Sequence, residues 1–405
     1  VISALQGLMC DKDFCTLYSL FMLALARKEL STCSFRLFIG EKPILLQTIE
    51  DLPTKATDEE LKEAFVDEWG VKYSKDGRKL LKAPKKLDGI YSIRKGTKII
   101  CEEAFRWSKT IGCLFLKSLV IPDSVTNIGD YAFWGCKSLK SLVISDSVTS
   151  IGDYAFDGCC SLRCVVISDG VTRIGNYAFW GCKSLKSLVI PDSVTHIGNG
   201  AFNACSSLKS LVIPASVGNI IGNPFSGWNG ELKCLSPYFI YDNKVLFDKD
   251  KSKIIAFRDR NTTSYVIPDS VSCIEFGAFW NCHSLKRLVL PDSVSSIGDW
   301  AFWNCRSLTD IVIPDSVNSI GDRVFFGCCS LKSLVLPDSV SSIGESAFED
   351  CTSLSSLVIP EGVTSIGHCA FRGCYSLSNI VIPNGVTSIG GCAFDGCKSL
   401  NSVVI

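Results

Sequence analysis

The strongest constraint on this chain is a sequence period of 23 residues. An isoleucine or leucine followed by a segment like Pro-Asp-Ser-Val recurs at this spacing in two blocks, from Ile121 to Ile213 and from Ile267 to Ile405. Repetition at a period of about 20–50 residues is typical of solenoids, in which each unit stacks on the next. The length of 405 residues therefore gives no count of globular domains, because a repetitive chain grows by adding units.

Each unit contains the alternation of a short strand. In the unit that ends at Ile144, the stretch 139–144 alternates so that Leu142 and Ile144 share one face. Proline or serine then ends the strand, because proline has no N–H to give to a ladder. We therefore predict that one unit forms one coil, with its strand parallel to the strands of the neighbouring coils.

The rest of the unit predicts a second extended piece and a tight turn. Val148 and Ile151 occupy the extended piece, Gly152 marks a positive φ or a crowded backbone, and Ala155 and Phe156 lie in the turn. About six buried apolar side chains per unit, each worth ~1.5–3 kcal/mol, do not offset the ~1–2 kcal/mol that ordering each backbone residue costs. Stacking on neighbouring units must supply the remaining stability.

The period is interrupted between Ile213 and Ile267, which lie 54 residues apart. The extra chain has strand-like runs at 238–241, 245–247 and 254–257 with turns between them, which predicts hairpins. The same module occurs at 71–105, which aligns with 245–279 without a gap at an offset of 174. We interpret the first copy as a cap that shields the end of the stack.

Upstream of this cap, the sequence predicts a helix from Thr57 to Gly70. Thr57 and Glu60 have the spacing of a capping box, and Gly70 is a typical stop. The apolar residues on one face of this helix are Leu61, Ala64, Phe65 and Trp69. The predicted organisation is an irregular segment (1–56), a helix and hairpin cap (57–105), a first repeat cassette (106–213), a hairpin insertion (214–266) and a second repeat cassette (267–405).

The two ends of the chain carry further signals. Phe14 to Ala26 is apolar and ends in small residues like the core of a secretion signal, but the charges before it are mixed, and a buried helix is the alternative. We treat 1–56 as a signal or truncated region. At the other end, Ile405 closes a strand with no cap after it. Unprotected strand edges pair with other chains, so we expect end-to-end self-association.

Ten of the 22 cysteines share one position of the repeat. They are Cys136, Cys159, Cys182, Cys205, Cys282, Cys305, Cys328, Cys351, Cys374 and Cys397. Parallel side chains about 5 Å apart suit a ladder of buried thiols better than disulfide geometry, and thiols favour a reducing setting. The alternative is a metal site at Cys369-x4-Cys374 or Cys392-x4-Cys397. Neither spacing matches the C-x2-C pairs of a closed zinc site. We therefore predict no bound metal and no cofactor.

The sequence contains no catalytic signature. Its three histidines, His196, His283 and His368, occupy different positions of the repeat, and no phosphate-binding loop or nucleophile elbow occurs. The 41 basic residues balance the 41 acidic ones, which gives no indication of nucleic-acid or membrane-surface binding. We predict a non-enzyme; a carbohydrate-active or hydrolytic site, as the alternative, would lie in the first 70 residues or in the 214–266 insertion.

Stacking turns a repeated position into a row of side chains. The basic row of the first cassette consists of Lys140, Arg163, Lys186 and Lys209, and its position holds Lys286 and Lys332 in the second cassette. An acidic row consists of Asp123, Asp146, Asp169, Asp192, Asp269, Asp292, Asp315 and Asp338. Opposed charged rows keep an array soluble. Alternatively, the basic row binds an acidic partner or a glycan.

Two further rows carry aromatic and aliphatic side chains. The aromatic row contains Tyr131, Tyr154, Tyr177, Trp134 and Trp180, with Trp280, Trp300 and Trp303 in the second cassette. Aromatic side chains occur at interface centres and as sugar platforms, and they also seal turns. The valine row contains Val143, Val166, Val189, Val212, Val289, Val312, Val335, Val358 and Val381. It points away from the interior, which indicates either an association surface or simple strand propensity.

The repeated pattern L-x-x-L-x-[IL]-P-D-S-V-x-x-I-G-x-x-A-F-x-x-C resembles the leucine-rich repeats of the BspA-like family over residues 71–405. The resemblance implies a β-solenoid with short parallel strands and tight turns, here with two hairpin-type insert modules. It also implies a bacterial or protist surface protein that acts in adhesion or binds host proteins.

We therefore predict a non-catalytic binding scaffold with a protein or glycan partner, located at the cell surface or secreted. An intracellular interaction scaffold in the cytoplasm is the alternative, which the reduced cysteines favour. No stretch of the sequence reaches the ~18 apolar residues of a membrane-spanning helix.

Overall fold

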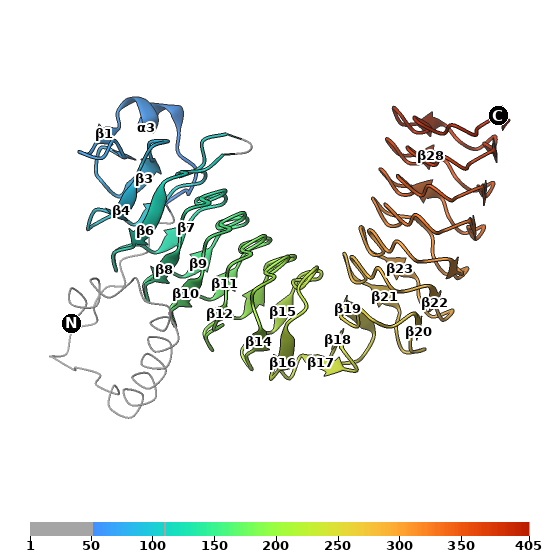
Figure 1. Cartoon of the computed structure of the whole chain (residues 1–405), viewed down its shortest axis with the longest axis horizontal. Helices are drawn as coiled ribbons and strands as arrows, with labels where there is room; N and C mark the ends of the chain where they lie inside the picture. Colours follow the sequence, from blue (N-terminus) through green and yellow to red (C-terminus); the bar gives the residue numbers. More distant parts are fainter. Residues whose placement is uncertain (1–51, 109–110, 405) are drawn as a thin grey trace, which may run out of the picture. The chain divides into compact units, whose positions relative to one another are not determined.

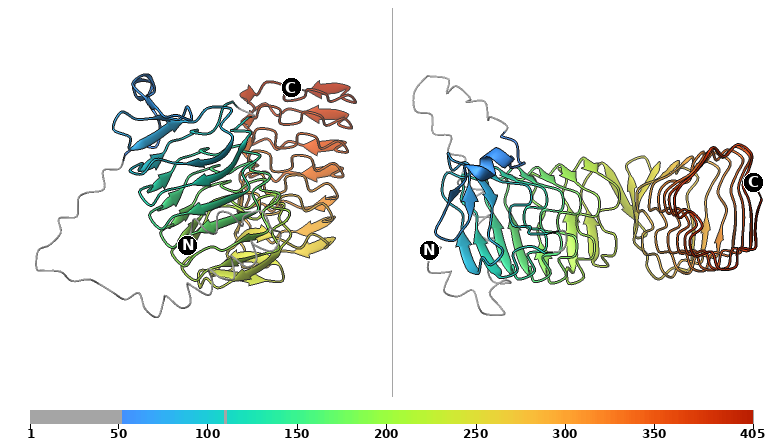
Figure 2. Two further views of the ribbon diagram at one scale, coloured as in Figure 1. Left: turned by 60° about the vertical axis from the view of Figure 1, so that its left-hand side comes forward. Right: turned by 90° about the horizontal axis from the view of Figure 1, so that it is seen from above.

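The computed structural model describes residues 52–108 and 111–404, which form stacked coils. Most regular coils contribute one strand to one sheet and a two-residue strand to a second sheet, and the coils lie side by side (Figure 1). The left view of Figure 2 shows successive coils as parallel layers. The predicted β-solenoid with short parallel strands and tight turns is confirmed.

The strands of the first repeat block belong to three sheets. One sheet contains β4 (Gly89–Ser92), β6 (Leu116–Val120), β8 (Ser141–Ile144), β10 (Cys164–Ile167) and β12 (Ser187–Leu188). The second contains β1 (Phe65–Val66), β2 (Lys72–Tyr73), β3 (Lys79–Lys82), β5 (Ile99–Ile100), β7 (Asn127–Ile128), β9 (Ser150–Ile151), β11 (Arg173–Ile174), β13 (His196–Ile197) and β15 (Asn219–Ile220). The third is the pair β14 (Ser210–Ile213) and β16 (Glu231–Cys234).

The insertion and the second repeat block contain the remaining strands. One sheet contains β17 (Phe239–Asp242), β18 (Val245–Asp248), β19 (Lys253–Phe257), β21 (Cys273–Ile274) and β23 (Ser296–Ile297). Two three-stranded sheets contain β20 (Ser264–Val266), β22 (Arg287–Val289) and β24 (Asp310–Ile311), and β26 (Ser342–Ile343), β28 (Ser365–Ile366) and β30 (Ser388–Ile389). Two pairs are β25 (Ser333–Val335) with β27 (Ser356–Val358), and β29 (Asn379–Val381) with β31 (Ser402–Val404).

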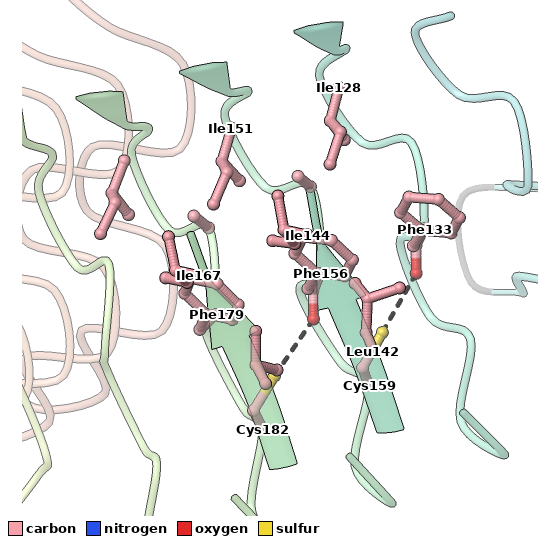
Figure 3. Close-up of a cluster of buried hydrophobic side chains, with 14 of the residues drawn as sticks. Ile128, Phe133, Leu142, Ile144, Ile151, Phe156, Cys159, Ile167, Phe179 and Cys182 are labelled. Carbon is pink, nitrogen blue, oxygen red and sulfur yellow. Dashed lines mark hydrogen bonds between the residues drawn. The ribbon is translucent and has the colours of Figure 1, made fainter. Parts of the chain in front are cut away.

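The coils stack in register at the sequence period. Strand β8 pairs with β10 in parallel so that Val143 lies beside Val166 and Ile144 beside Ile167. A residue and its counterpart 23 positions later are therefore neighbours in space, as the period predicts. The core consequently contains columns of like side chains, and Figure 3 shows the column of Phe133, Phe156 and Phe179. Their ring centroids are 5.1 and 5.4 Å apart.

The buried cysteines form the predicted ladder of thiols. The Cys159 thiol donates to the carbonyl oxygen of Phe133 at 3.2 Å, and Cys182 donates to Phe156 at 3.3 Å (Figure 3). The cysteines of the described part are present as thiols. Burial raises the pKa of the Cys159 thiol, so the side chain keeps the proton that it donates. Each thiol thus joins one coil to the phenylalanine carbonyl of the coil before it.

Gly152 is required by crowding rather than by its backbone conformation. A Cβ atom at this position would lie 2.6 Å from the carbonyl carbon of Gly129 and 2.7 Å from the backbone nitrogen of Asp130. The positive φ angles of this coil fall instead on Tyr154, at 56°, and on Gly158, at 71°. The glycine therefore sets how closely two coils approach.

The predicted helix from Thr57 to Gly70 is wrong beyond its first turn. The structure has a single short helix here, α3 (Asp58–Lys62). The capping box is confirmed, since Thr57 Oγ1 accepts from the Glu60 backbone N–H at 3.1 Å and Glu60 Oε2 accepts from the Thr57 N–H at 2.9 Å. Good caps nucleate this helix but do not determine its length.

A hairpin replaces the rest of the predicted helix. Phe65 lies in β1, which pairs antiparallel with β2. The Asp67 side chain accepts from the backbone N–H groups of Trp69 and Val71 at 3.0 and 2.8 Å, which fixes a turn. Phe65 and Trp69, placed by the prediction on one apolar face of the helix, are 47% and 52% exposed. Strand pairing and an aspartate turn therefore override the helical spacing.

The two insert modules have the same strand arrangement. Strand β2 pairs antiparallel with β3, and β3 pairs parallel with β5; β18, β19 and β21 repeat this order. The second module divides the apolar interior into two cores, one drawn from residues 71–256 and the other from residues 245–393. At this division the Arg258 guanidinium lies over the rings of Phe225 and Trp228, at 5.3 and 4.2 Å.

Some sequence-based expectations fall outside the described residues. The apolar run from Phe14 to Ala26 and the terminal Ile405 are among them. The predicted domain limits within 52–404 stay a prediction. Of the helices in the described ranges, none is long and apolar enough to cross a bilayer.

The thiol ladder makes a prediction about stability. Replacing Cys159 with alanine removes a buried sulfur and its hydrogen bond, so we expect the free energy of unfolding to fall by about 1–3 kcal/mol in urea titration. Cys160→Ala is the matched control, because the neighbouring Cys160 is only half-buried. The control should change the free energy by less than about 0.5 kcal/mol. Equal losses in both variants would contradict the ladder's role.

Candidate functional site

The basic row lies where the chain enters successive strands: Lys140, Arg163 and Lys186 precede β8, β10 and β12 of one sheet, and Lys209 precedes β14 of the next sheet. The backbone N–H of Arg163 donates to the Lys140 carbonyl at 2.8 Å, and that of Lys186 donates to the Arg163 carbonyl at 3.1 Å. All four side chains of the row are exposed. Within residues 52–108 and 111–404, none of the four forms an ion pair with an acidic side chain. The structure therefore brings the four cations together as a line of unneutralised charge.

The tyrosines of the aromatic row stack on one another. The rings of Tyr131 and Tyr154 are 4.7 Å apart at an interplanar angle of 4°, and those of Tyr154 and Tyr177 are 4.8 Å apart. The Arg106 guanidinium covers Tyr131 at 4.8 Å, and Trp180 lies 5.1 Å from Tyr177. The ring faces thus contact each other, and a ligand would meet ring edges. This geometry favours the alternative interpretation, in which the aromatic side chains seal the turns.

Trp134 belongs to a small polar cluster. Its Nε1 donates to Asp157 Oδ2 at 2.7 Å, and its ring lies 4.7 Å from the Arg106 guanidinium. Burial raises the pKa of Asp157 to about 6, although the bond from Trp134 and the charge of Arg106 both act to lower it. The cluster fixes the indole against the next coil.

An aspartate and asparagine ladder beside the tyrosines was not predicted from the sequence. The Oδ1 atoms of Asp130, Asp153 and Asn176 accept from the backbone N–H groups 23 residues later, at 2.7, 2.8 and 2.9 Å. The signal was available, because this repeat position is Asp or Asn in four consecutive units. A hollow of about 410 Å³ borders this ladder and is lined by Asp153, Tyr154, Asn176, Tyr177, Asn199, Ile221 and Phe276.

A family model for the BspA type leucine rich repeat region matches six copies, over residues 98–230, 253–375 and 318–405. The chain belongs to this family. A search of curated proteins gave no match.

Three solved structures of bacterial proteins are similar to this BspA-type repeat chain. A leucine rich cell surface protein from Faecalibacterium prausnitzii is 30% identical, with a TM-score of 0.56, over 84% of this chain and 94% of that one. A leucine-rich repeat protein from Eubacterium ventriosum is 26% identical, with a TM-score of 0.55, over 69% of this chain and 82% of that one. The pneumococcal vaccine antigen PcpA, 19% identical with a TM-score of 0.54 over 84% and 98% of the two chains, shares the fold.

The BspA-type sheet exposes its valine row. In the second block Val312, Val335 and Val358 are 78%, 71% and 63% exposed, while Val143 and Val212 of the first block are 46% and 42% exposed. Strand pairing places Val335 directly beside Val358. Val189 is 61% exposed and Val289 is 36% exposed, so the apolar strip is most open from Val312 to Val358 of the second block.

The described BspA-type coils do not gather the histidines or the cysteines into a site. In residues 52–108 and 111–404, no group of three or more His, Cys, Asp or Glu side chains is arranged to hold a metal ion. His196 Nδ1 lies 2.7 Å from Thr195 Oγ1, and His283 Nδ1 lies 3.0 Å from the Asn304 carbonyl oxygen. These contacts are local and belong to different coils.

The raised pKa of Asp157 predicts a pH dependence of stability. Between about pH 4 and 6, Asp157 is protonated in the folded chain and ionised in the unfolded chain. The contribution of Asp157 to the free energy of unfolding is therefore fully present below about pH 4 and is lost as the pH rises through about 6. Asp157→Asn keeps an acceptor for Trp134 without the charge. We expect the melting temperature of the wild type, relative to this variant, to fall across that range.

The control for this experiment is Asp146→Asn, which removes a carboxylate from the exposed acidic row. Its melting temperature should stay within about 1 °C of the wild-type value at every pH from 4 to 7. A parallel pH dependence in the wild type and in Asp157→Asn would show that Asp157 does not take up the proton.

Proposed function

We propose that this protein is a non-catalytic scaffold that binds partner proteins in adhesion at the cell surface. The observation that carries the proposal is the valine row of the second block, where Val335 and Val358 are exposed side by side and Val312 is exposed at the same position of the coil before them. Contiguous apolar strips on a folded surface are typical of association sites. The similarity to a bacterial leucine rich cell surface protein supports the location.

The mechanism is additive binding along a rigid strip. Neighbouring strands are ~4.8 Å apart, so each added coil brings another valine within reach of the same partner. Exposed polar side chains flank the strip on the same strands, including Arg287 and Asp310. An apolar centre with a polar rim is the usual composition of a protein interface.

The insertion supports a structural role better than a hydrolytic one. Three of its five acidic side chains make local contacts: Asp242 Oδ2 pairs with Lys251 at 3.0 Å, Asp248 accepts from Ser252 Oγ at 2.6 Å, and Asp259 pairs with Lys244 at 3.3 Å. These contacts hold the hairpins together, which supports the structural role.

The second candidate function is an intracellular interaction scaffold. The specific observation in its favour is the thiol state of the described cysteines, since thiols are typical of reducing compartments. Protease treatment of intact cells separates the two candidates. Cleavage without lysis supports the surface scaffold, and cleavage only after lysis supports the intracellular one.

Adhesion through the valine row is tested by changing its most exposed members. Replacing Val312, Val335 and Val358 with threonine keeps the side-chain shape and strand propensity but adds hydroxyl groups to the strip. Beads coated with the full-length chain should adhere to cell monolayers, and beads coated with this variant should adhere about tenfold less. Bead counts after washing provide the measurement.

The matched control replaces the same three valines with isoleucine, which keeps the strip apolar. This control should adhere as well as the wild type. The proposal is wrong if wild-type beads adhere no better than beads coated with albumin, or if the threonine variant adheres equally well.

A further inference from the structure

The chain segments that carry the basic row contain no acidic residue. The segments that carry the row and its flanking strand positions are 136–144, 159–167, 182–190 and 205–213, and none contains Asp or Glu. Two of them add a further exposed cation, at Lys137 and Lys183. The chain as a whole has no net charge, so the excess of positive charge along these segments is a local feature.

Backbone hydrogen bonds between coils hold the residues of the basic row close together. The backbone N–H groups of Arg163 and Lys186 donate to the carbonyls of Lys140 and Arg163, at 2.8 and 3.1 Å. Lys209 follows Lys186 at the same repeat position, one coil later. Adjacent strands are ~4.8 Å apart, which is less than the Debye length of ~8 Å at physiological ionic strength. The potentials of the four side chains therefore add, and their mutual repulsion is relieved by a bound anionic chain.

The row has defined ends. Lys117, one coil before the row, lies 3.6 Å from the carboxylate of Asp88. At the other end, Glu231 takes the place beside Ser210 in the next strand. Acidic side chains thus bound a segment of four coils. A line of positive charge that repeats from coil to coil matches a linear polyanion better than the scattered carboxylates of a folded protein.

We propose that the basic row binds a linear sulfated polysaccharide. This ligand is additional to the partner protein of the proposed function and uses a different row of the same coils. Sulfate groups repeat along such a polymer, so several can contact successive cations at once, and each contact releases counterions. Binding is therefore multivalent and strongly dependent on salt.

A single-stranded nucleic acid is the less favourable polyanion for this surface. Proteins that bind such strands combine basic grooves with open aromatic faces on which the bases stack. The tyrosines of the first block cover one another at 4.7 and 4.8 Å, so their faces are not open. The basic row therefore offers charge without a stacking platform, which suits a sulfated sugar chain.

The test measures binding of the full-length protein to immobilised heparin over a series of salt concentrations. The variant changes Lys140, Arg163, Lys186 and Lys209 to glutamine. We expect at least a tenfold loss of affinity at about 0.15 M salt, and a shallower dependence of log affinity on log salt. All four side chains are exposed, so the variant should melt at the wild-type temperature.

The matched control removes four exposed cations from the second block, by changing Lys286, Arg287, Lys332 and Lys398 to glutamine. It loses the same net charge and should keep most of its heparin affinity. Desulfated heparin and a thymidine oligonucleotide are the comparison ligands, and both should bind more weakly than heparin.

Three results would overturn the assignment: no heparin binding by the wild type, equal losses in the two glutamine variants, or binding of the oligonucleotide at least as tight as that of heparin. The threonine variant of the valine row should keep its heparin affinity. Loss of adhesion with intact heparin binding, or the reverse, therefore shows which of the two proposals fails.

Discussion

In-register pairing between coils is the constraint on which the rest of this structure depends. A strand of one coil bonds to the strand 23 residues later with like residues opposite one another, as Val143 is opposite Val166. The backbone N–H and C=O groups of each strand are thereby satisfied by its neighbours. The same register determines the interior columns and the surface rows together, because side chains on a strand alternate between the two faces.

The interior shows why particular residue types recur. Phenylalanine rings with centroids 4.7 to 6.1 Å apart fill the space between coils, and cysteine thiols beside them lie 3.1 to 4.0 Å from a phenylalanine carbonyl oxygen of the preceding coil. A thiol is small, apolar and still able to donate a hydrogen bond, which suits a buried position facing a carbonyl oxygen. The high cysteine content therefore follows from packing between coils.

The sequence predicted the fold well because its period fixes which residues become neighbours. It predicted the helix at Thr57 to Gly70 poorly, since the turn built by Asp67 and the pairing of Phe65 with Tyr73 depend on chain that follows. The exposed position of the valine row followed from strand alternation. That of the basic row did not, because Lys140 has the same parity as the buried Leu142 and Ile144. The stacking of Tyr131 on Tyr154 did not, because ring direction depends on a left-handed backbone that the spacing does not reveal.

The division of the interior into two cores has a consequence for how the array loses structure. In a solenoid each coil is stabilised by its immediate neighbours, so melting that starts at one end spreads from coil to coil. At the insertion, the Arg258 guanidinium over Phe225 interrupts this succession of like contacts. Fraying of one block would therefore stop there, and the array would behave as two cooperative segments joined in one chain.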